Sequence, residues 1–304
     1  MMRPLFLFAI VAVVLAVVIY EGLLAHRKMV VNDSLKLVFS SGTNQGTVLR
    51  NLQKMGAQAV PAEVQALSQT GEIGSAAELA LLNNRSATNV LPKIVSLLED
   101  KNPEVRLRAA GLISDKVANG IRLSDSTFVP ALARALNDTN DYVREEMALA
   151  LSELGPAAEL AVPALAKALN DNSARVRIMA AMALLKIDAS QKAAVVPVFK
   201  DVIANGNARD RHWAAVYLHQ IQPENAEIIP VFVGSLTNQE SGIRSSAAYS
   251  LLSYGSNAKI AIPALQKALG DADADVRQAA RDALQNIDPA ALKNKNAQAD
   301  APAP

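Results

Sequence analysis

The side chains that most often carry chemistry are few in this chain, and they stand far apart. There are three histidines, His26, His212 and His219, and no cysteine. His212 and His219 are seven residues apart, so on a helix roughly 10 Å separates them, too far to chelate one metal ion without further ligands. The lack of cysteine excludes disulfides, thiolate metal sites and cysteine nucleophiles. We therefore expect no metal and no cofactor.

Sequence motifs for catalysis are also missing. No H-E-x-x-H, phosphate-binding loop, dinucleotide-binding or nucleophile-elbow pattern occurs. Adjacent acidic residues such as Glu145 and Glu146 are typical of solvated surfaces. The 30 basic and 29 acidic side chains leave a net charge of +1, which gives no general attraction to nucleic acid. These features predict a non-catalytic protein that does not bind nucleic acid.

The one charged group that recurs regularly is an arginine. Each copy follows a proline by fourteen residues and an aspartate or asparagine by six. The prolines are separated by 38, 33, 34, 33 and 33 residues. The arginines are Arg106, Arg144, Arg177, Arg211, Arg244 and Arg277. A motif repeated at such fixed offsets predicts an array of similar structural units.

Each unit has the pattern of two helices. The first should begin at the proline, whose fixed φ suits the start of a helix, and an Asn/Asp-rich turn should end it. On the second helix of the third unit, Val176, Ala180, Leu184 and Ile187 fall on one stripe. We expect this stripe to be buried. The first interval is longer than the others, which predicts a loop near Lys116 to Ser126.

From Asn89 to Asp288 the units resemble HEAT repeats, in particular the short subtype found in phycobilisome lyases. Segments such as NDNSARVRIMAAMALLKI carry the typical Asp, Val-Arg, Ala-Ala and Leu positions. The resemblance implies an all-α, right-handed α-solenoid of about six to seven helix pairs. It also implies that each arginine bonds the aspartate of its own turn and of the next, and that second helices line a concave surface.

Positions that vary between units are the candidate binding residues. One, two and five residues after the repeated arginine, the residue type changes from unit to unit, and variable positions on a repeat are usually exposed. Methionine, tryptophan and tyrosine suit a protein-binding surface. The predicted partner-binding residues are Met179, Met182, His212, Trp213 and Tyr249. The alternative is a purely structural role, in which some of these residues pack against the neighbouring unit.

A hydrophobic N-terminal segment predicts membrane attachment. Leu5 to Tyr20 contains sixteen residues without a charge, about 24 Å as a helix, and an extension to Ala25 would span the roughly 30 Å of a bilayer core. We expect an uncleaved single-pass anchor with the repeats outside the cytoplasm, in the periplasm if the source is bacterial. A cleaved signal peptide ending at Leu23-Leu24-Ala25 is the competing interpretation.

The expected organisation is therefore an anchor over residues 1–28, a linker over 29–45, repeats over 46–288 and a disordered tail over 289–304. Clear units should start near residues 91, 129, 162, 196, 229 and 262. The favoured function is a membrane-tethered scaffold that binds a protein or peptide on the concave face. The alternatives are a lyase or lyase subunit resembling bilin lyases, and a non-catalytic subunit that stabilises a membrane complex.

Overall fold

The computed structural model describes residues 64, 66–68, 72–83, 91–118 and 128–292, and these contain helices and no strand. The chain divides into two larger parts, each made of several repeats: Met1–Ala168, called the first unit from here on, and Leu169–Pro304, called the second unit. The predicted anchor, the linker, and residues 293–304 of the predicted tail lie outside the described residues.

The first unit is a series of antiparallel helix pairs preceded by α5 (Glu72–Asn83). The first pair is α6 (Leu91–Ser96), extended by η4 (Leu97–Glu99), and α7 (Pro103–Ala118). The second is α8 (Val129–Ala135) with α9 (Asp141–Leu154), followed by η6 (Gly155–Ala161) and α10 (Val162–Ala168). The part of the predicted loop that can be seen is helical, because α7 continues through Lys116 to Ala118.

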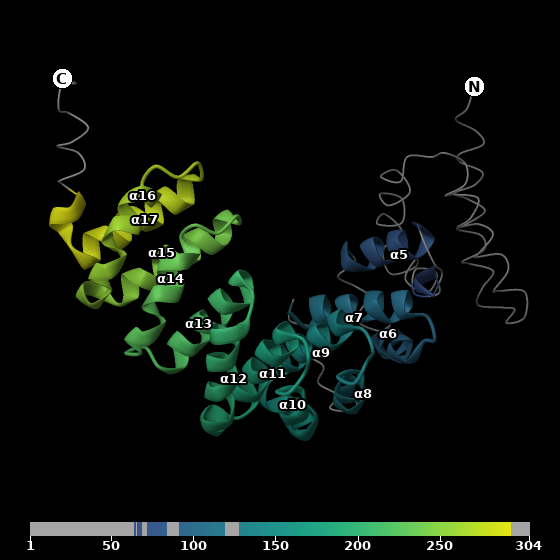
Figure 1. The fold of residues 1–304 in the computed structure, drawn as a ribbon. Helices are drawn as coiled ribbons and strands as arrows, with labels where there is room; N and C mark the ends of the chain where they lie inside the picture. The colour runs from purple at the N-terminus through teal and green to yellow at the C-terminus, as the bar shows by residue number, and fades with distance from the viewer. Residues whose placement is uncertain (1–63, 65, 69–71, 84–90, 119–127, 293–304) are drawn as a thin grey trace, which may run out of the picture. The chain divides into compact units, whose positions relative to one another are not determined.

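The second unit begins at α11 (Ala174–Ile187) and continues with three pairs, shown in green to yellow in Figure 1. These pairs are η7 (Ala189–Gln191), α12 (Lys192–Asn205) and α13 (Ala208–Ile221); η8 (Ala226–Ile228), α14 (Ile229–Ser235) and α15 (Ser241–Ser253); and η9 (Gly255–Ala261), α16 (Ile262–Ala268) and α17 (Ala274–Ile287). We call α7, α9, α11, α13, α15 and α17 the second helices, and their repeated arginines the ladder arginines. Successive second helices of this unit pack side by side.

Burial follows the predicted helical stripe. Val176, Ala180 and Leu184 are at most 1% exposed, and Ile187 is 9% exposed. Small alanines in the middle of the stripe allow neighbouring helices to approach closely. Each helix buries one apolar face against its neighbours, which is how a repeat array gains stability that a single repeat lacks.

Prolines stand at the starts of most first helices, as predicted, usually as the second helical residue. Pro197 differs, because α12 begins at Lys192 and contains this proline inside it. The helix also runs on to Asn205, so only Gly206 and Asn207 separate it from α13. A Cβ atom on Gly206 would lie 2.6 Å from the Val202 carbonyl oxygen, so this short turn needs glycine.

One apolar stretch, Asp141–Ala168, has the length and the mean hydropathy, 1.3, of a membrane span. It is not one straight helix: Gly155 ends α9 with a φ of 56°, and Ala158 departs from helical angles inside η6. Met147, Ala150 and Leu151 are fully buried in it. These facts identify the stretch as two packed repeat helices joined by a kink.

The ladder arginines join neighbouring turns, but not quite as expected. Within its own unit each described bond goes to the main-chain carbonyl of the turn residue, as from Arg177 to Asp171 at 2.8 Å, and not to its carboxylate. The carboxylates that accept bonds from the ladder arginines belong to the turn of the next repeat. Arg106 holds both oxygens of Asp138 at 2.6 and 3.1 Å, and Arg244 holds both oxygens of Asp271 at 2.8 Å.

The ladder is irregular around α12 and α13. Arg177 reaches Asp201 on α12 at 3.3 Å, because the turn that should supply a carboxylate has Asn205 instead. Arg211 is exposed and faces a next turn that carries Asn238 in place of aspartate. Hence the carboxylate ladder is irregular at Arg177 and Arg211, and the next arginine, Arg244, again holds a carboxylate with two bonds.

Candidate functional site

The surface position of a side chain on a second helix follows from its distance to the ladder arginine. A helix turns about 100° per residue, so the fifth residue after the arginine points directly away from the buried stripe. The first and the second residue after the arginine lie on either side of the fifth residue, and we call these the first and second flank positions. All six residues at the fifth position are at least partly exposed, whereas the residues at the first and second positions range from buried to exposed.

His212 is at a flank and is buried, which corrects the expectation that it lies on the surface. It is 0% exposed, and its Nε2 lies 3.0 Å from the hydroxyl oxygen of Ser246 on α15. Its ring packs edge-on against Trp213 and Phe232, at centroid distances of 5.3 and 5.9 Å. The reason is that the first flank position of one second helix faces the second flank position of the next.

The electrostatics of His212 agree with this burial. Removal from water lowers its pKa from 6.5 to about 4, because the charged imidazolium is disfavoured there. Its Nδ1 is buried and has no hydrogen-bond partner in the described part of the chain. A neutral, packed histidine at pH 7 does not offer a charge to a partner.

The fifth positions of the second unit form a partly exposed row. Met182, Val216, Tyr249 and Asp282 follow one another on α11, α13, α15 and α17. Tyr249 is 50% exposed. Three of the four are apolar or aromatic, although they point away from the core. We call Met182, Val216 and Tyr249 the apolar row.

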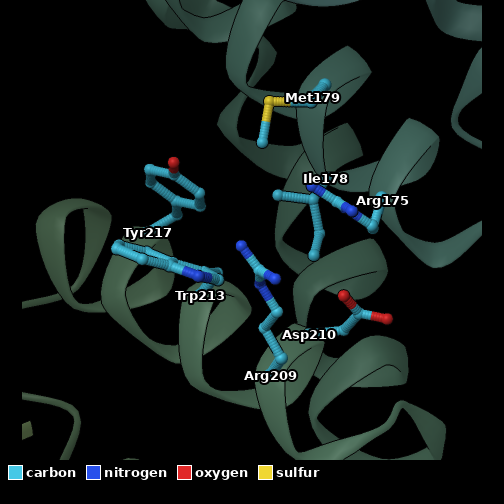
Figure 2. Close-up of a pocket in the computed structure, with 7 residues that line it drawn as sticks. All are labelled: Arg175, Ile178, Met179, Arg209, Asp210, Trp213 and Tyr217. Carbon is cyan, nitrogen blue, oxygen red and sulfur yellow. The ribbon is translucent and has the colours of Figure 1, made fainter. Parts of the chain in front are cut away.

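A pocket of about 120 Å³ opens between α11 and α13 (Figure 2). We call it the α11–α13 pocket. Its lining residues are Arg175, Ile178, Met179, Arg209, Asp210, Trp213 and Tyr217. The Trp213 and Tyr217 rings stack at 6.4 Å with an angle of 30° and form one wall. In Figure 2, Arg175 and Arg209 extend from the two helices toward the space in front of these rings.

Asp210 belongs to the helix cap of α13. Its backbone N–H donates to the Asn207 side chain at 2.9 Å, and its carboxylate accepts from the Asn207 amide at 2.7 Å. This reciprocal pair resembles a capping box, except that the side-chain amide of Asn207 and not its backbone N–H donates to the carboxylate. It explains why Asp210 stands where other repeats have valine or isoleucine. The cap keeps the Asp210 carboxylate engaged at the pocket edge.

The predicted partner-binding residues thus fall into three environments. Met179 and Trp213 line the pocket, Met182 and Tyr249 belong to the apolar row, and His212 is buried. Whether any of them binds a partner remains a prediction.

The sequence prediction missed the charged part of the pocket, although a signal for it existed. Two residues before the ladder arginine, the six units carry Glu104, Tyr142, Arg175, Arg209, Gly242 and Asp275. Six residues after it they carry Leu112, Ala150, Ala183, Tyr217, Ser250 and Ala283. Comparing these positions would have shown that paired arginines and the added tyrosine occur only where the pocket lies.

A second polar cluster joins α13 to α15. His219 Nδ1 lies 2.9 Å from the Tyr254 hydroxyl, which donates to the Asn225 carbonyl at 3.1 Å, and Nε2 lies 2.8 Å from Ser253 Oγ. Burial lowers the pKa of His219 and raises that of Tyr254 to about 12. Serine–histidine enzymes place a carboxylate behind the histidine to stabilise its charged form. A neutral phenol does not supply that charge, so this geometry favours a tether between helices.

The described residues contain no group of three or more His, Cys, Asp or Glu side chains arranged to hold a metal ion.

The family follows from comparison with known proteins. A model of HEAT repeats matches residues 91–184, 129–219 and 196–285. These stretches together run from residue 91 to 285, more than half of the 304-residue chain. The chain belongs to the HEAT-repeat family. No curated protein matches it.

Several solved structures align with the chain at low sequence identity. The Escherichia coli protein YibA aligns with a TM-score of 0.56 and 17% identity, covering 86% of this chain and 93% of YibA. An engineered protein aligns with a TM-score of 0.50 and 22% identity, covering 95% and 92%. The CpcE–CpcF complex of phycocyanin lyase from a Nostoc species aligns at 0.45 and 18%, covering 74% and 93%. At such low identities, the likeness to YibA and to the engineered protein indicates a shared fold only.

Proposed function

We propose that this HEAT-repeat chain is a non-catalytic scaffold that binds a protein or peptide on the second-helix face of its second unit. The apolar row carries the proposal. Met182, Val216 and Tyr249 point away from the core, where an ordinary solvated helix would carry polar residues. Aromatic and methionine side chains grouped on a surface are typical of protein interfaces. Trp213, beside this row, adds a large side chain of the kind that dominates binding energy.

Photo-crosslinking tests this function. A photo-reactive amino acid in place of Met182 or Tyr249 in the full chain should give a discrete crosslinked species in cells. Trp213→Ala should weaken that species. Ile260, which is 68% exposed in the linker helix η9, supplies a matched apolar control position outside the row. Equal crosslinking from Ile260 and Met182 would count against a specific surface.

Membrane tethering is the second part of the proposal, and it rests on the uncharged segment from Leu5 to Tyr20. A tether would concentrate the scaffold near membrane-bound partners. The full chain should stay in the membrane fraction after alkaline carbonate extraction, and a chain lacking residues 1–28 should not. A reporter fused to the C-terminus should be active outside the cytoplasm. An intact mass starting near His26 would instead indicate a cleaved signal peptide.

The α11–α13 pocket gives no support to the bilin-lyase alternative. Its 120 Å³ is well below the roughly 300–1,000 Å³ of pockets that enclose whole small molecules, so it would not enclose a tetrapyrrole. A visible absorbance band in the purified protein would revive that alternative.

A further inference from the structure

We propose that the α11–α13 pocket binds an acidic side chain of a partner peptide, with a neighbouring apolar side chain of the same peptide lying on Trp213. This inference rests on the proposed function and names the chemistry of the partner. It makes the pocket the charged anchor beside the apolar row.

The chemistry of the walls selects the ligand. Two guanidinium groups, from Arg175 and Arg209, meet one carboxylate, from Asp210, which leaves one net positive charge among the lining residues. Guanidinium groups present paired donors that match the two oxygens of a carboxylate. Trp213, Tyr217 and Met179 provide the apolar surface opposite. A ligand with a carboxylate next to an aliphatic or aromatic group can bind the arginines and the apolar surface at the same time.

The volume limits the ligand to one side chain. About 120 Å³ is close to the roughly 150 Å³ cavity that holds a single benzene ring. A glutamate or aspartate side chain fits this space, whereas a nucleotide does not.

Arg209 is available for exchange with a partner carboxylate. Its present ion pair, with Glu240, spans 3.5 Å, and the two side chains are 50% and 52% exposed. An exposed pair of this kind contributes little, because water screens it. A partner carboxylate that contacts both Arg175 and Arg209 would form more charge-assisted bonds than Glu240 forms with Arg209 alone.

The position of the arginines also argues for a local purpose. At the same repeat position the other units carry glutamate, tyrosine, glycine or aspartate. The neighbouring pair of arginines therefore occurs only at the pocket that also has the stacked Trp213 and Tyr217 rings. A repeat-wide structural role would place arginine in every unit.

Trp213 is the only tryptophan, so its fluorescence reports on the pocket directly. The first probe is a pair of ions, iodide and caesium, compared in the folded full chain. The two guanidinium groups beside the ring should make iodide a more effective quencher than caesium. Arg175→Gln and Arg209→Gln should each reduce this preference. Arg281→Gln, an exposed arginine on α17, is the control and should not change it.

The second probe is a pair of blocked peptides, Gly-Ser-Glu-Leu-Gly-Ser and its Gln counterpart, followed by Trp213 emission. The Glu peptide should bind about tenfold more tightly, because charge-assisted bonds to arginine are lost in the Gln peptide. Arg209→Gln should remove the difference. Glu240→Gln should increase affinity for the Glu peptide, because it removes the competing carboxylate.

The outcomes separate the two proposals. Equal quenching by iodide and caesium, or equal binding of the two peptides, overturns the acidic-ligand inference. If crosslinking at Met182 still succeeds, the scaffold function stands without it. If crosslinking also fails, both fall.

Discussion

The buried histidine of α13 makes the stability of the second unit sensitive to mild acid. Below pH 6.5 the unfolded chain binds a proton at His212, whereas the folded chain does not until about pH 4. The free energy of unfolding therefore falls as the pH decreases through this window. The contribution of neutral His212 to the free energy of unfolding is fully present above pH 6.5 and is lost as the pH falls to about 4.

The expected size follows from the pKa difference. At 1.36 kcal/mol per pKa unit, lowering the pKa from 6.5 to about 4 corresponds to about 3 kcal/mol in full and about 2 kcal/mol between pH 7 and pH 5. His219, whose pKa is also lowered, acts in the same direction. Glu78, whose pKa burial raises, acts oppositely. A variant that changes only His212 separates its share from theirs.

His212→Phe is that variant, because phenylalanine keeps an aromatic ring beside Trp213 and Phe232. It loses the 3.0 Å contact with Ser246 but also removes the unpaired Nδ1, so its stability at pH 7 should change by only about 1 kcal/mol.

Urea titrations at pH 5 and pH 7, followed by Trp213 fluorescence, should show a pH loss that is about 2 kcal/mol smaller in the variant. Parallel pH profiles for the two proteins would refute the argument and would indicate that Nδ1 is hydrogen-bonded in solution.

Three further predictions concern particular side chains. Arg244→Gln should lower the free energy of unfolding by about 2 kcal/mol, because it loses two 2.8 Å bonds to Asp271. Arg211→Gln at the equivalent position should change it by less than about 0.5 kcal/mol. Equal losses of stability in the two variants, measured by thermal unfolding, would contradict the ladder. Trp213→Ala should cost less than the roughly 3–5 kcal/mol of a buried aromatic, since Trp213 is partly exposed, and acrylamide should quench its emission. Gly255→Ala should destabilise by about 1–2 kcal/mol because φ is 51° there, while Gly242→Ala, with open space around it, should be neutral or stabilising.

The repeat period fixes much of the fold in advance. The buried stripe of α11 and the proline-led first helices follow from residue types at regular spacing, because helix geometry converts spacing directly into facing. The early start of α12 does not follow from it, since nothing in the Pro197 position indicates that the preceding five residues are also helical. Helix ends depend on local caps, which vary between units.

The candidate site was only partly visible for a related reason. Variation between units identifies positions that are free of the common core, but it does not measure depth. Tyr249 varies because it is exposed, and His212 varies because it packs against Ser246, a residue that varies with it. The pocket could be found only once the neighbouring helices were known, because Arg175 and Arg209 belong to different helices and line one pocket only in the folded structure.

The interrupted ladder and the pocket share one cause. Where the ladder is regular, a carboxylate of the next turn clamps the start of a second helix, as Asp271 clamps Arg244. The short turn at Gly206 carries no such carboxylate, and Arg177 instead contacts the carboxylate of Asp201 on α12 at 3.3 Å. The starts of α11 and α13 lack this clamp, and the side chains of Arg175, Arg209 and Trp213 line the pocket between these helices.

Restoring the ladder on the other side of α13 tests this interpretation. Asn238 Oδ1 accepts the Glu240 N–H at 2.9 Å, just as Asp271 Oδ1 accepts the Asp273 N–H at 2.9 Å, so Asn238→Asp should fit without rearrangement. Its carboxylate should pair with Arg211 and raise the free energy of unfolding by about 1 kcal/mol. Combining it with Arg211→Gln should abolish the gain, and this coupling distinguishes an ion pair from a general charge effect. An equal gain with and without Arg211 would show that Arg211 does not reach the turn, and the repeat geometry would then not transfer to this unit.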